Sequence, residues 1–165
     1  MDATDATIID LLQDDARTTQ ATIARQVGLS QPSVADRIRK LEEAGIITGY
    51  IARVDPKRLG KDITAFVSVD IDHPRHFDDF ARIVQGMSDV LECHRVAGAG
   101  SYVLKVRTED TGSLDRLLVE HLRVIPGVMR TNTTIVLSSV KEECRVPTNR
   151  ETGAASWPSL RWRIG

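Results

Sequence analysis

The stretch of residues 20–44 limits the possible folds more than any other part of this sequence. It contains two short segments of helical periodicity joined by Gly28, a residue that readily adopts the positive φ of a tight turn. Apolar side chains recur three and four residues apart in the first segment, at Ile23, Ala24 and Val27. The second segment begins with Ser30, a favoured N-cap, and Pro32, whose missing N–H costs nothing in a first helical turn. Two short helices joined by a tight turn are therefore expected here.

The second of these helices has one apolar face and one polar face. The apolar, inner face consists of Val34, Ile38 and Leu41. The pattern predicts a helix-turn-helix, the motif that inserts its second helix into the major groove of double-stranded DNA. The residues on or beside the open face are the DNA-binding candidates: Ser30, Gln31, Ser33, Asp36, Arg37, Arg39 and Lys40. Arg37 is expected to reach a base edge or a phosphate, and Lys40 the DNA backbone. On the motif alone, an ordinary pair of packed helices in a core remains the alternative.

The flanking residues extend the motif to a small domain. Residues 5–13 have helical periodicity and can pack a third helix against the other two. Gly45 is expected to end the second helix, because glycine is common just after a helix. Residues 46–56 show an alternating pattern with β-branched side chains, which predicts a short wing or connecting strand. We therefore expect a winged helix-turn-helix domain over residues 1–54, followed by a linker over residues 55–62.

The second half of the sequence changes its periodicity and predicts a different domain. Strand and helix patterns follow in the order β-α-β-β-α-β, at residues 63–72, 75–87, 90–97, 101–108, 113–125 and 128–140. This order is the ferredoxin-like plan, with both helices on one face of an antiparallel sheet, so the fold class is α+β. The alternation is expected to leave apolar side chains on the other face, which a second copy of the chain would bury. The domain over residues 63–143 is therefore expected to form a homodimer through its sheet faces.

Composition and charge are those of a globular protein that would need to bind DNA as an oligomer. Of the 165 residues, 41% are hydrophobic and 27% are charged, and no apolar run approaches the roughly 20 residues of a membrane helix. Two distant cysteines, Cys93 and Cys144, make no disulfide framework, which predicts a reducing, cytoplasmic location. The net charge is −1, so one module would neutralise few phosphates and bind DNA weakly. Tight binding therefore requires several modules in one assembly.

The sequence offers no catalytic or metal-binding constellation. His73 and His76 have the spacing of a metal-binding pair, but they lack a third ligand nearby. Cys93 and His94 are neighbours on a predicted strand, so their side chains point to opposite faces and cannot form a nucleophile–base pair. We expect a protein that is not an enzyme and has no metal or cofactor.

Several segments of the chain together carry a family resemblance. They are DATIIDLLQDDAR (5–17), IARQVGLS (23–30), VADRIRKLEEAGIITGY (34–50), CHRVAG (93–98), YVLKV (102–106) and IPGVMRTNTTIVL (125–137). With these segments the chain resembles the Lrp/AsnC, or feast/famine, family of prokaryotic transcription regulators. The resemblance implies that the second domain is a ligand-binding (RAM) sensor domain. It also implies a small-molecule effector, usually an amino acid, and dimers that assemble into octamers or larger forms.

The resemblance further implies an effector cleft between subunits, near the loop that joins the two central strands. The candidate residues are Gly98, Ala99, Gly100, Ser101 and Tyr102, with Thr131 and Thr133 on the last strand. Backbone N–H groups of a glycine-rich loop can bind a carboxylate, and a side-chain acceptor can bind an ammonium group. Many members of the family have an aspartate at the position of Ser101, so a different effector or another acceptor remains open. A tight hairpin selected for its turn geometry alone is the alternative.

Residues 144–165 differ in composition from the rest of the chain. They are rich in Ser, Thr, Gly and Pro, which is typical of a flexible tail. Trp157 and Trp162 favour a different interpretation, in which the tail is anchored on a neighbouring subunit. The sequence leaves both interpretations open.

Three functions remain compatible with these observations. The leading hypothesis is a sequence-specific DNA-binding transcriptional regulator that a small metabolite controls. The second is an architectural protein that wraps DNA without an effector. The third is an enzyme, because haem-pathway decarboxylases resemble this two-domain plan, with His94 and Arg95 as candidate residues at a tetrapyrrole. The intact recognition helix argues against the third hypothesis.

Overall fold

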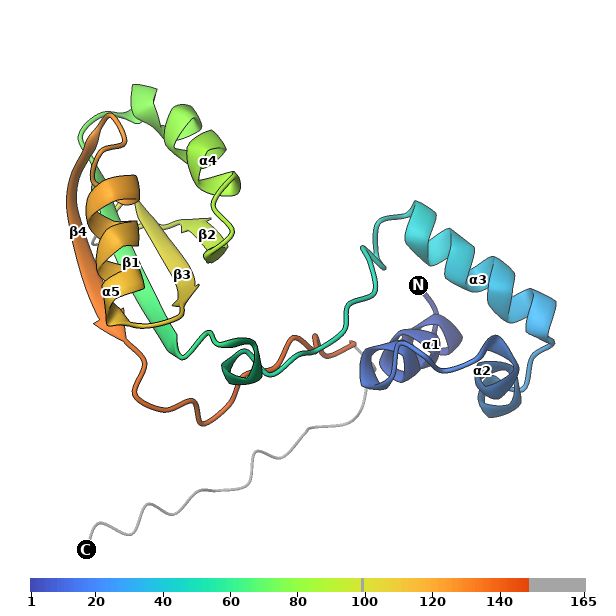
Figure 1. Ribbon diagram of the computed structural model, residues 1–165. Helices are drawn as coiled ribbons and strands as arrows, with labels where there is room; N and C mark the ends of the chain where they lie inside the picture. The colour runs from blue at the N-terminus through green and yellow to red at the C-terminus, as the bar shows by residue number, and fades with distance from the viewer. Residues whose placement is uncertain (99, 149–165) are drawn as a thin grey trace, which may run out of the picture. The chain divides into compact units, whose positions relative to one another are not determined.

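The chain folds as two separate units in the computed structural model of Figure 1. The structure describes residues 1–98 and 100–148. Unit 1 comprises residues 1–53 together with the described residues from 143 onward, and unit 2 comprises residues 54–142. Ala99 lies outside the described residues, as do Trp157 and Trp162, so the predictions for the end of the tail stay predictions. Among the described residues, no helix combines the length and the apolar character that a membrane span requires.

Unit 1 is built from three helices: α1 (Ala3–Asp14), α2 (Gln20–Val27) and α3 (Gln31–Glu43). Gly28 ends α2 with φ 69°, and the hydroxyl of Ser30 caps α3. These are the turn and the cap that the sequence predicts, so the helix-turn-helix is confirmed. The apolar stripes of the three helices meet in one core: Ile8, Ile23, Ala24, Val34, Ile38 and Leu41.

The strand expected within residues 46–56 does not form in the described part of the chain. The backbone N–H groups of Ile46 and Ile47 both donate to the carbonyl of Leu41, at 2.9 and 3.1 Å, and so close the end of α3. A strand requires a neighbour to pair with, and the sheet of the described residues contains only the four strands of unit 2. The prediction of a strand at residues 46–56 is therefore wrong.

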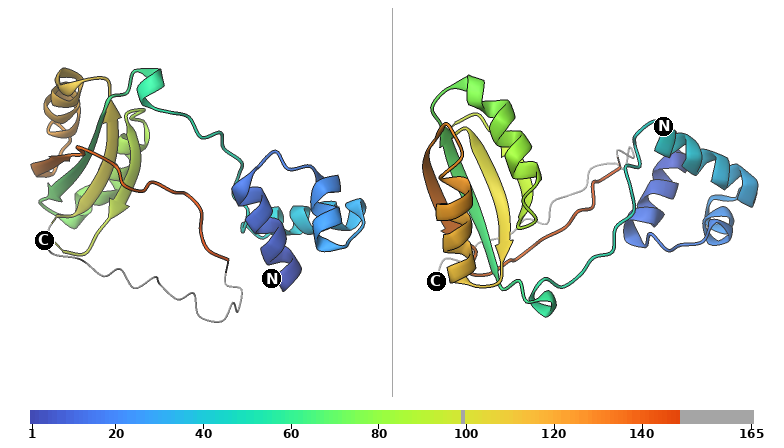
Figure 2. Two further views of the ribbon diagram at one scale, coloured as in Figure 1. Left: turned by 90° about the horizontal axis from the view of Figure 1, so that it is seen from below. Right: turned by 45° about the horizontal axis from the view of Figure 1, so that its top comes forward.

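Unit 2 has one antiparallel sheet covered by helices on one face. The strands are β1 (Ile63–Ile71), β2 (Val90–Arg95), β3 (Tyr102–Thr108) and β4 (Val128–Ile135), in the order β2-β3-β1-β4. Helix α4 (Phe77–Gln85) follows β1, and α5 (Thr111–Arg116) follows β3 and continues as a π-helical turn, η3 (Leu117–Leu122). Both helices pack on the same face, as the right-hand view of Figure 2 shows. The predicted β-α-β-β-α-β order is confirmed.

The helix-covered face of the sheet is apolar and the open face is largely polar. Ala65, Val67 and Val69 of β1 face the helices together with three residues of β3: Tyr102, Leu104 and Val106. The alternate residues of β1 and their cross-strand partners lie on the open face: Thr64, Phe66, Ser68, Asp70, Val103, Lys105, Arg107, Arg130, Asn132 and Thr134. Phe66, 43% exposed, and Val103 are the apolar members of this set. The expectation of a substantially apolar second face is therefore wrong, because charged and hydroxyl side chains occupy most alternate positions.

Candidate DNA-binding surface and effector site

The start of α3 presents a polar, solvent-exposed group of side chains. The hydroxyl of Ser30 accepts a hydrogen bond from the backbone N–H of Ser33 at 3.3 Å, and the two hydroxyl oxygens lie 2.8 Å apart. Ser30, Gln31 and Ser33 are all exposed. The N-terminal residues of a recognition helix are the ones that contact base edges, and here the cap fixes the backbone at the start of α3.

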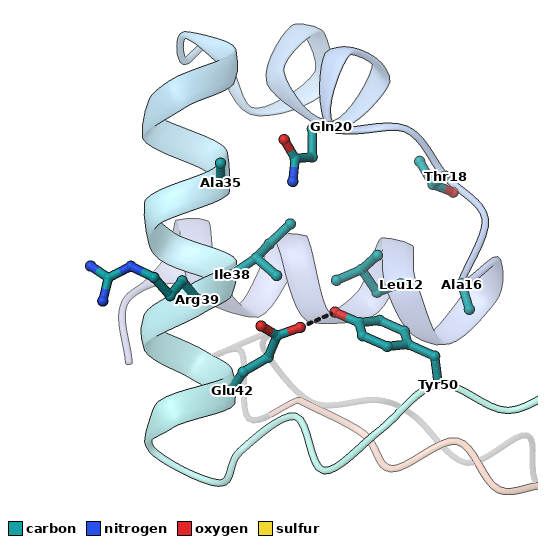
Figure 3. Close-up of a pocket in the computed structure, with 9 residues that line it drawn as sticks. All are labelled: Leu12, Ala16, Thr18, Gln20, Ala35, Ile38, Arg39, Glu42 and Tyr50. Carbon is teal, nitrogen blue, oxygen red and sulfur yellow. Dashed lines mark hydrogen bonds between the residues drawn. The ribbon is translucent and has the colours of Figure 1, made fainter.

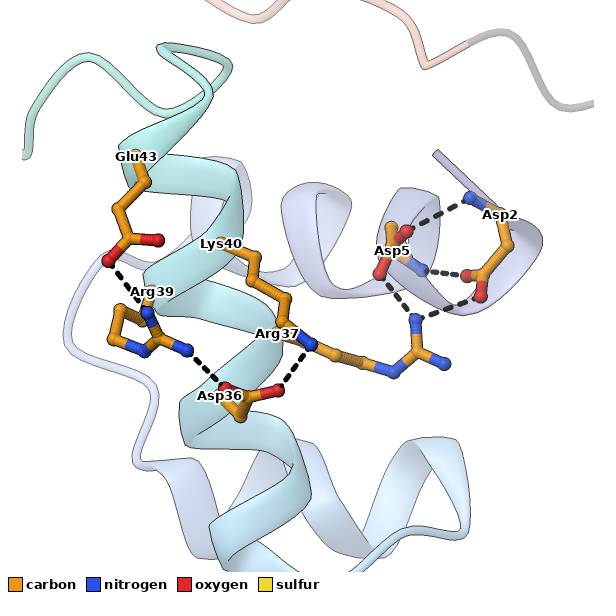
Figure 4. A network of polar contacts seen from close by, with 7 residues as sticks. All are labelled: Asp2, Asp5, Asp36, Arg37, Arg39, Lys40 and Glu43. Carbon is orange, nitrogen blue, oxygen red and sulfur yellow. Dashed lines mark hydrogen bonds and ion pairs between the residues drawn. The ribbon is translucent and has the colours of Figure 1, made fainter.

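Arg37 is tied to the first helix of the unit (Figure 4). Its Nη1 atom donates to Asp2 Oδ2 at 2.8 Å and to Asp5 Oδ1 at 2.6 Å. Asp2 is the N-cap of α1, and its carboxylate also accepts the N–H of Asp5. Hydrogen bonds from the backbone of Asp5 and from Arg37 lower the pKa of Asp2, and both carboxylates raise the pKa of Arg37. In this structure the guanidinium links α3 to α1, which the sequence analysis missed.

The other charged residues of α3 form pairs with one another. Asp36 binds Arg39 at 2.5 Å and Lys40 at 2.7 Å, and hydrogen bonds from Lys40 and Arg39 lower the pKa of Asp36. Arg39 also contacts Glu43 at 2.7 Å. Because exposed ion pairs contribute little to stability, DNA phosphates can replace these carboxylates at small cost. The structure thus gives each predicted basic residue of α3 a carboxylate partner, with Arg37 turned toward α1 and with Arg39 and Lys40 paired within α3.

A shallow hollow of about 380 Å³ lies beside α3 (Figure 3). Leu12 and Ile38 line its apolar part, and Tyr50 borders it from the segment after α3. The hydroxyl of Tyr50 donates to Glu42 Oε1 at 2.9 Å, and burial together with this carboxylate raises the pKa of Tyr50 to about 12. Residues expected to form a wing strand therefore pack as irregular chain against the recognition helix.

A segment from the end of the described chain binds α1. The side-chain amide of Gln13 brackets the backbone of Val146, donating at 2.9 Å and accepting at 2.7 Å. The hydroxyl of Thr148 contacts both carboxylate oxygens of Asp10 at 3.0 Å, and Arg145 contacts Asp14 at 2.9 Å. Residues 145–148 are thus held in unit 1, whereas composition predicts a flexible tail from residue 144.

The predicted effector loop is hydrogen-bonded to the end of β1. The N–H of Ser101 donates to the carbonyl of Val69 at 2.8 Å, and the hydroxyl of Ser101 accepts the N–H of Ile71 at 3.1 Å. Gly98 and Gly100 have φ values of 138° and 95°, which favour glycine. The Ser101 hydroxyl therefore has a structural partner, and the glycines have conformational reasons to be in the loop.

The remaining effector candidates face the helices and lie away from the open face. Tyr102 is 6% exposed, its ring packs 4.8 Å from that of Phe80, and its hydroxyl donates to the carbonyl of Phe77 at 3.3 Å, so its side chain belongs to the core. Thr131 pairs in register with Val69, and its hydroxyl accepts Arg123 Nε at 3.1 Å. Thr133 pairs with Val67 and so faces the same way. The side chains of Tyr102, Thr131 and Thr133 therefore lie on the helix-covered face of the sheet and not on its open face.

The residues considered for enzymatic or metal chemistry have other contacts. His94 Nε2 lies 3.3 Å from Glu92, and the guanidinium of Arg95 lies 4.4 Å above the ring of Phe77. His76 lies 2.7 Å from Asp72. Among residues 1–98 and 100–148, no group of three or more potential metal ligands occurs. His94 and Arg95 therefore have local surface partners that account for their positions.

Two family models match successive parts of the chain. A winged helix-turn-helix DNA-binding model matches residues 1–48, and the Lrp/AsnC ligand-binding domain model matches residues 64–146. Among curated proteins, the proline dehydrogenase transcriptional activator of Rhizobium radiobacter is 36% identical over 144 residues, covering 86% of this chain and 92% of the relative. The leucine-responsive regulatory protein of Escherichia coli is 35% identical over 148 residues, covering 88% and 90%.

Solved structures agree with these sequence matches. A transcriptional regulator of Neisseria meningitidis in complex with L-methionine is 29% identical, with a TM-score of 0.86 and coverage of 90% of this chain and 97% of that one. A feast or famine regulatory protein of Mycobacterium tuberculosis, also complexed with L-methionine, is 33% identical, with a TM-score of 0.83 and coverage of 89% and 99%. From its two matching domains, their order and these relatives, the chain belongs to the Lrp/AsnC family of transcriptional regulators.

Proposed function

We propose that this protein is a sequence-specific DNA-binding transcriptional regulator whose assembly or DNA affinity responds to a small metabolite, an amino acid. One observation carries the proposal. A capped recognition helix with exposed polar residues at its start precedes a ligand-binding domain in the same chain. Relatives that share this order over about nine tenths of their length are named as transcriptional regulators.

The DNA-binding surface of the proposal is the exposed side of α3. We assign Ser30, Gln31 and Ser33 to base-edge contacts, because they lie at the start of the helix. The four charged candidates, Asp36, Arg37, Arg39 and Lys40, contact bases or phosphates after exchanging their carboxylate partners. This assignment requires that the basic side chains leave their carboxylate partners when DNA binds. Arg37 is the decisive test of it, because two carboxylates of α1 hold its guanidinium.

The effector site of the proposal is centred on the loop of Gly98, Gly100 and Ser101. Two related regulators are described as complexes with L-methionine, which supports an amino-acid effector for this chain. The glycines allow a ligand to approach the backbone N–H groups closely. We place the ligand on the open side of this loop, because Tyr102 fills the helix-covered side.

The test of the proposed function is a DNA footprint. The DNA that flanks the protein's own coding region serves as the probe, with and without each of the twenty amino acids. We expect a protected site. When the effector is present, the length of the protected DNA or the protein concentration needed for protection is expected to change. Sequence-specific protection that no amino acid alters would support an effector-independent architectural protein, and an absence of specific protection would reject the regulator.

A second prediction concerns assembly. One recognition helix neutralises too few phosphates for tight binding, so we propose a dimer that assembles further, to octamers. We propose that two chains meet through the open sheet face, around its apolar residues Phe66, which is 43% exposed, and Val103. Light scattering at micromolar concentration is expected to give a dimer or a multiple of it. Phe66→Asp would place a charge in the sheet-face interface and is expected to lower the mass. A parent protein that remains monomeric would contradict the proposal.

A further inference from the structure

An ion pair lies on the open sheet face beside the effector loop. Asp70 on β1 and Arg130 on β4 are directly opposite each other in the antiparallel register. Arg130 Nε donates to Asp70 Oδ2 at 2.9 Å. The side chains are 31% exposed for Asp70 and 79% exposed for Arg130. In the single chain the pair is therefore partly exposed, on the same sheet face through which we propose that the dimer forms.

The effector loop lies directly against the carboxylate of Asp70. A Cβ atom at Gly100 would be 3.4 Å from Asp70 Oδ1 and 3.7 Å from the Cβ of Ser68. The two hydrogen bonds of Ser101, to Val69 and to Ile71, hold the loop on either side of Asp70. The pairing of β1 with β4 shifts register between Asp70 and Ile71, and such bulges re-aim side chains next to binding sites.

The hydrogen bond between Arg130 and Asp70 uses one nitrogen of the guanidinium and one oxygen of the carboxylate. It uses Oδ2 of the carboxylate, so Oδ1, the atom turned toward Gly100, can accept from a ligand. It uses Nε of the guanidinium, so the terminal amino groups of Arg130 can bind an anion in a bidentate manner. An acceptor for a cation and a donor for an anion therefore lie side by side.

A zwitterionic α-amino acid presents the complementary pair of charges. The geometry points to Asp70 and Arg130 as the residues that bind the head group of the effector. The ammonium group donates to Asp70 Oδ1, and the carboxylate accepts from Arg130. Ser68 and Asn132, opposite each other on the same face, border the site with polar groups. This inference rests on the proposed function, since it names the residues that recognise an amino-acid effector.

A structural role of the pair makes a different prediction. Exposed ion pairs contribute only about 0–1 kcal/mol to stability, so loss of either charge leaves the fold nearly unchanged. A purely structural pair would also leave ligand affinity unchanged. Binding measurements therefore separate the two roles.

The test is titration calorimetry on the full chain with the twenty amino acids, beginning with L-methionine. For the amino acid that binds most tightly, two further probes are used: the same molecule without its ammonium group, and the same molecule without its carboxylate. The variants are Asp70→Asn and Arg130→Gln. Arg82→Gln is the control, because it removes the charge from another exposed ion pair, on α4.

Asp70→Asn is expected to weaken binding of the amino acid roughly tenfold or more but to leave the probe without ammonium unaffected. Arg130→Gln is expected to weaken the amino acid similarly and to leave the probe without carboxylate unaffected. Arg82→Gln is expected to bind like the parent. Parent-like affinity in both test variants would overturn the head-group assignment while the amino-acid response stands. A parent protein that binds none of the twenty would overturn both the assignment and the proposed effector class.

Discussion

Gly127→Ala is expected to lower the free energy of unfolding of unit 2 by about 2–5 kcal/mol. A Cβ atom at this position would lie 2.3 Å from Nδ1 of His76, and the residue has φ 89°. The imidazole is held in place, because Nδ1 lies 2.7 Å from Asp72 Oδ1 and Nε2 accepts Arg75 Nε at 3.2 Å. The new methyl group therefore meets both backbone strain and a fixed ring. Chemical denaturation followed by circular dichroism measures the loss.

Gly60→Ala separates the two contributions. Gly60 has φ 73° in the same unit, but a Cβ atom there would have nothing within 4 Å. This variant is expected to lose only the conformational cost of about 1–2 kcal/mol. Removing the ring in the double variant His76→Ala/Gly127→Ala should recover most of the steric part. Equal losses in Gly127→Ala and Gly60→Ala would contradict the close packing of His76 against Gly127.

The helix-turn-helix could be predicted because its signals are local. Gly28 and Ser30 act on the residues next to them, and the apolar spacing of α3 appears within a few turns. The order of strands and helices in unit 2 could also be predicted, because the periodicity changes between segments. In these regions the physical cause and its consequence lie within the same stretch of sequence.

Contacts between distant residues could not be predicted in this way. The partners of Arg37 are 35 and 32 residues away, and Gln13 and Val146 are 133 residues apart. Nothing near Arg37 in the sequence indicates that α1 would supply two carboxylates. The strand at residues 46–56 was wrongly predicted for the same reason, since its pattern does not provide a pairing partner.

The direction of side chains near the effector loop depends on the strand register. Tyr102 follows the loop directly, so the sequence alone groups it with the loop, but the pairing of Val69 with Tyr102 places its ring in the core. Thr131 and Thr133 follow the same register through β1. Asp70, which lies 31 positions before Ser101 in the sequence, has no local feature that connects it to the loop. The cross-strand pairing of β1 with its two neighbours makes this connection.

Arg37→Ala is expected to weaken binding to the operator by about 1–3 kcal/mol, or roughly fivefold to 150-fold, with a smaller effect on random DNA. A guanidinium that hydrogen-bonds to a base edge contributes to binding only where the DNA carries that base. Lys40→Ala serves as the comparison, because a phosphate contact is lost equally from all sequences and the salt dependence becomes shallower. Electrophoretic mobility shifts at several salt concentrations measure both effects.

Asp5→Asn reveals how Arg37 acts. Asp5 holds the guanidinium at 2.6 Å, and asparagine removes the charge but keeps an oxygen acceptor. If Arg37 must leave α1 to reach DNA, weaker retention by α1 makes this exchange easier, so Asp5→Asn is expected to raise operator affinity. If Arg37 instead supports binding by holding α3 against α1, the same variant lowers the affinity. A loss in both Asp5→Asn and Arg37→Ala would therefore reassign Arg37 from reading DNA to positioning the recognition helix, and would leave base readout to Gln31 and Ser33.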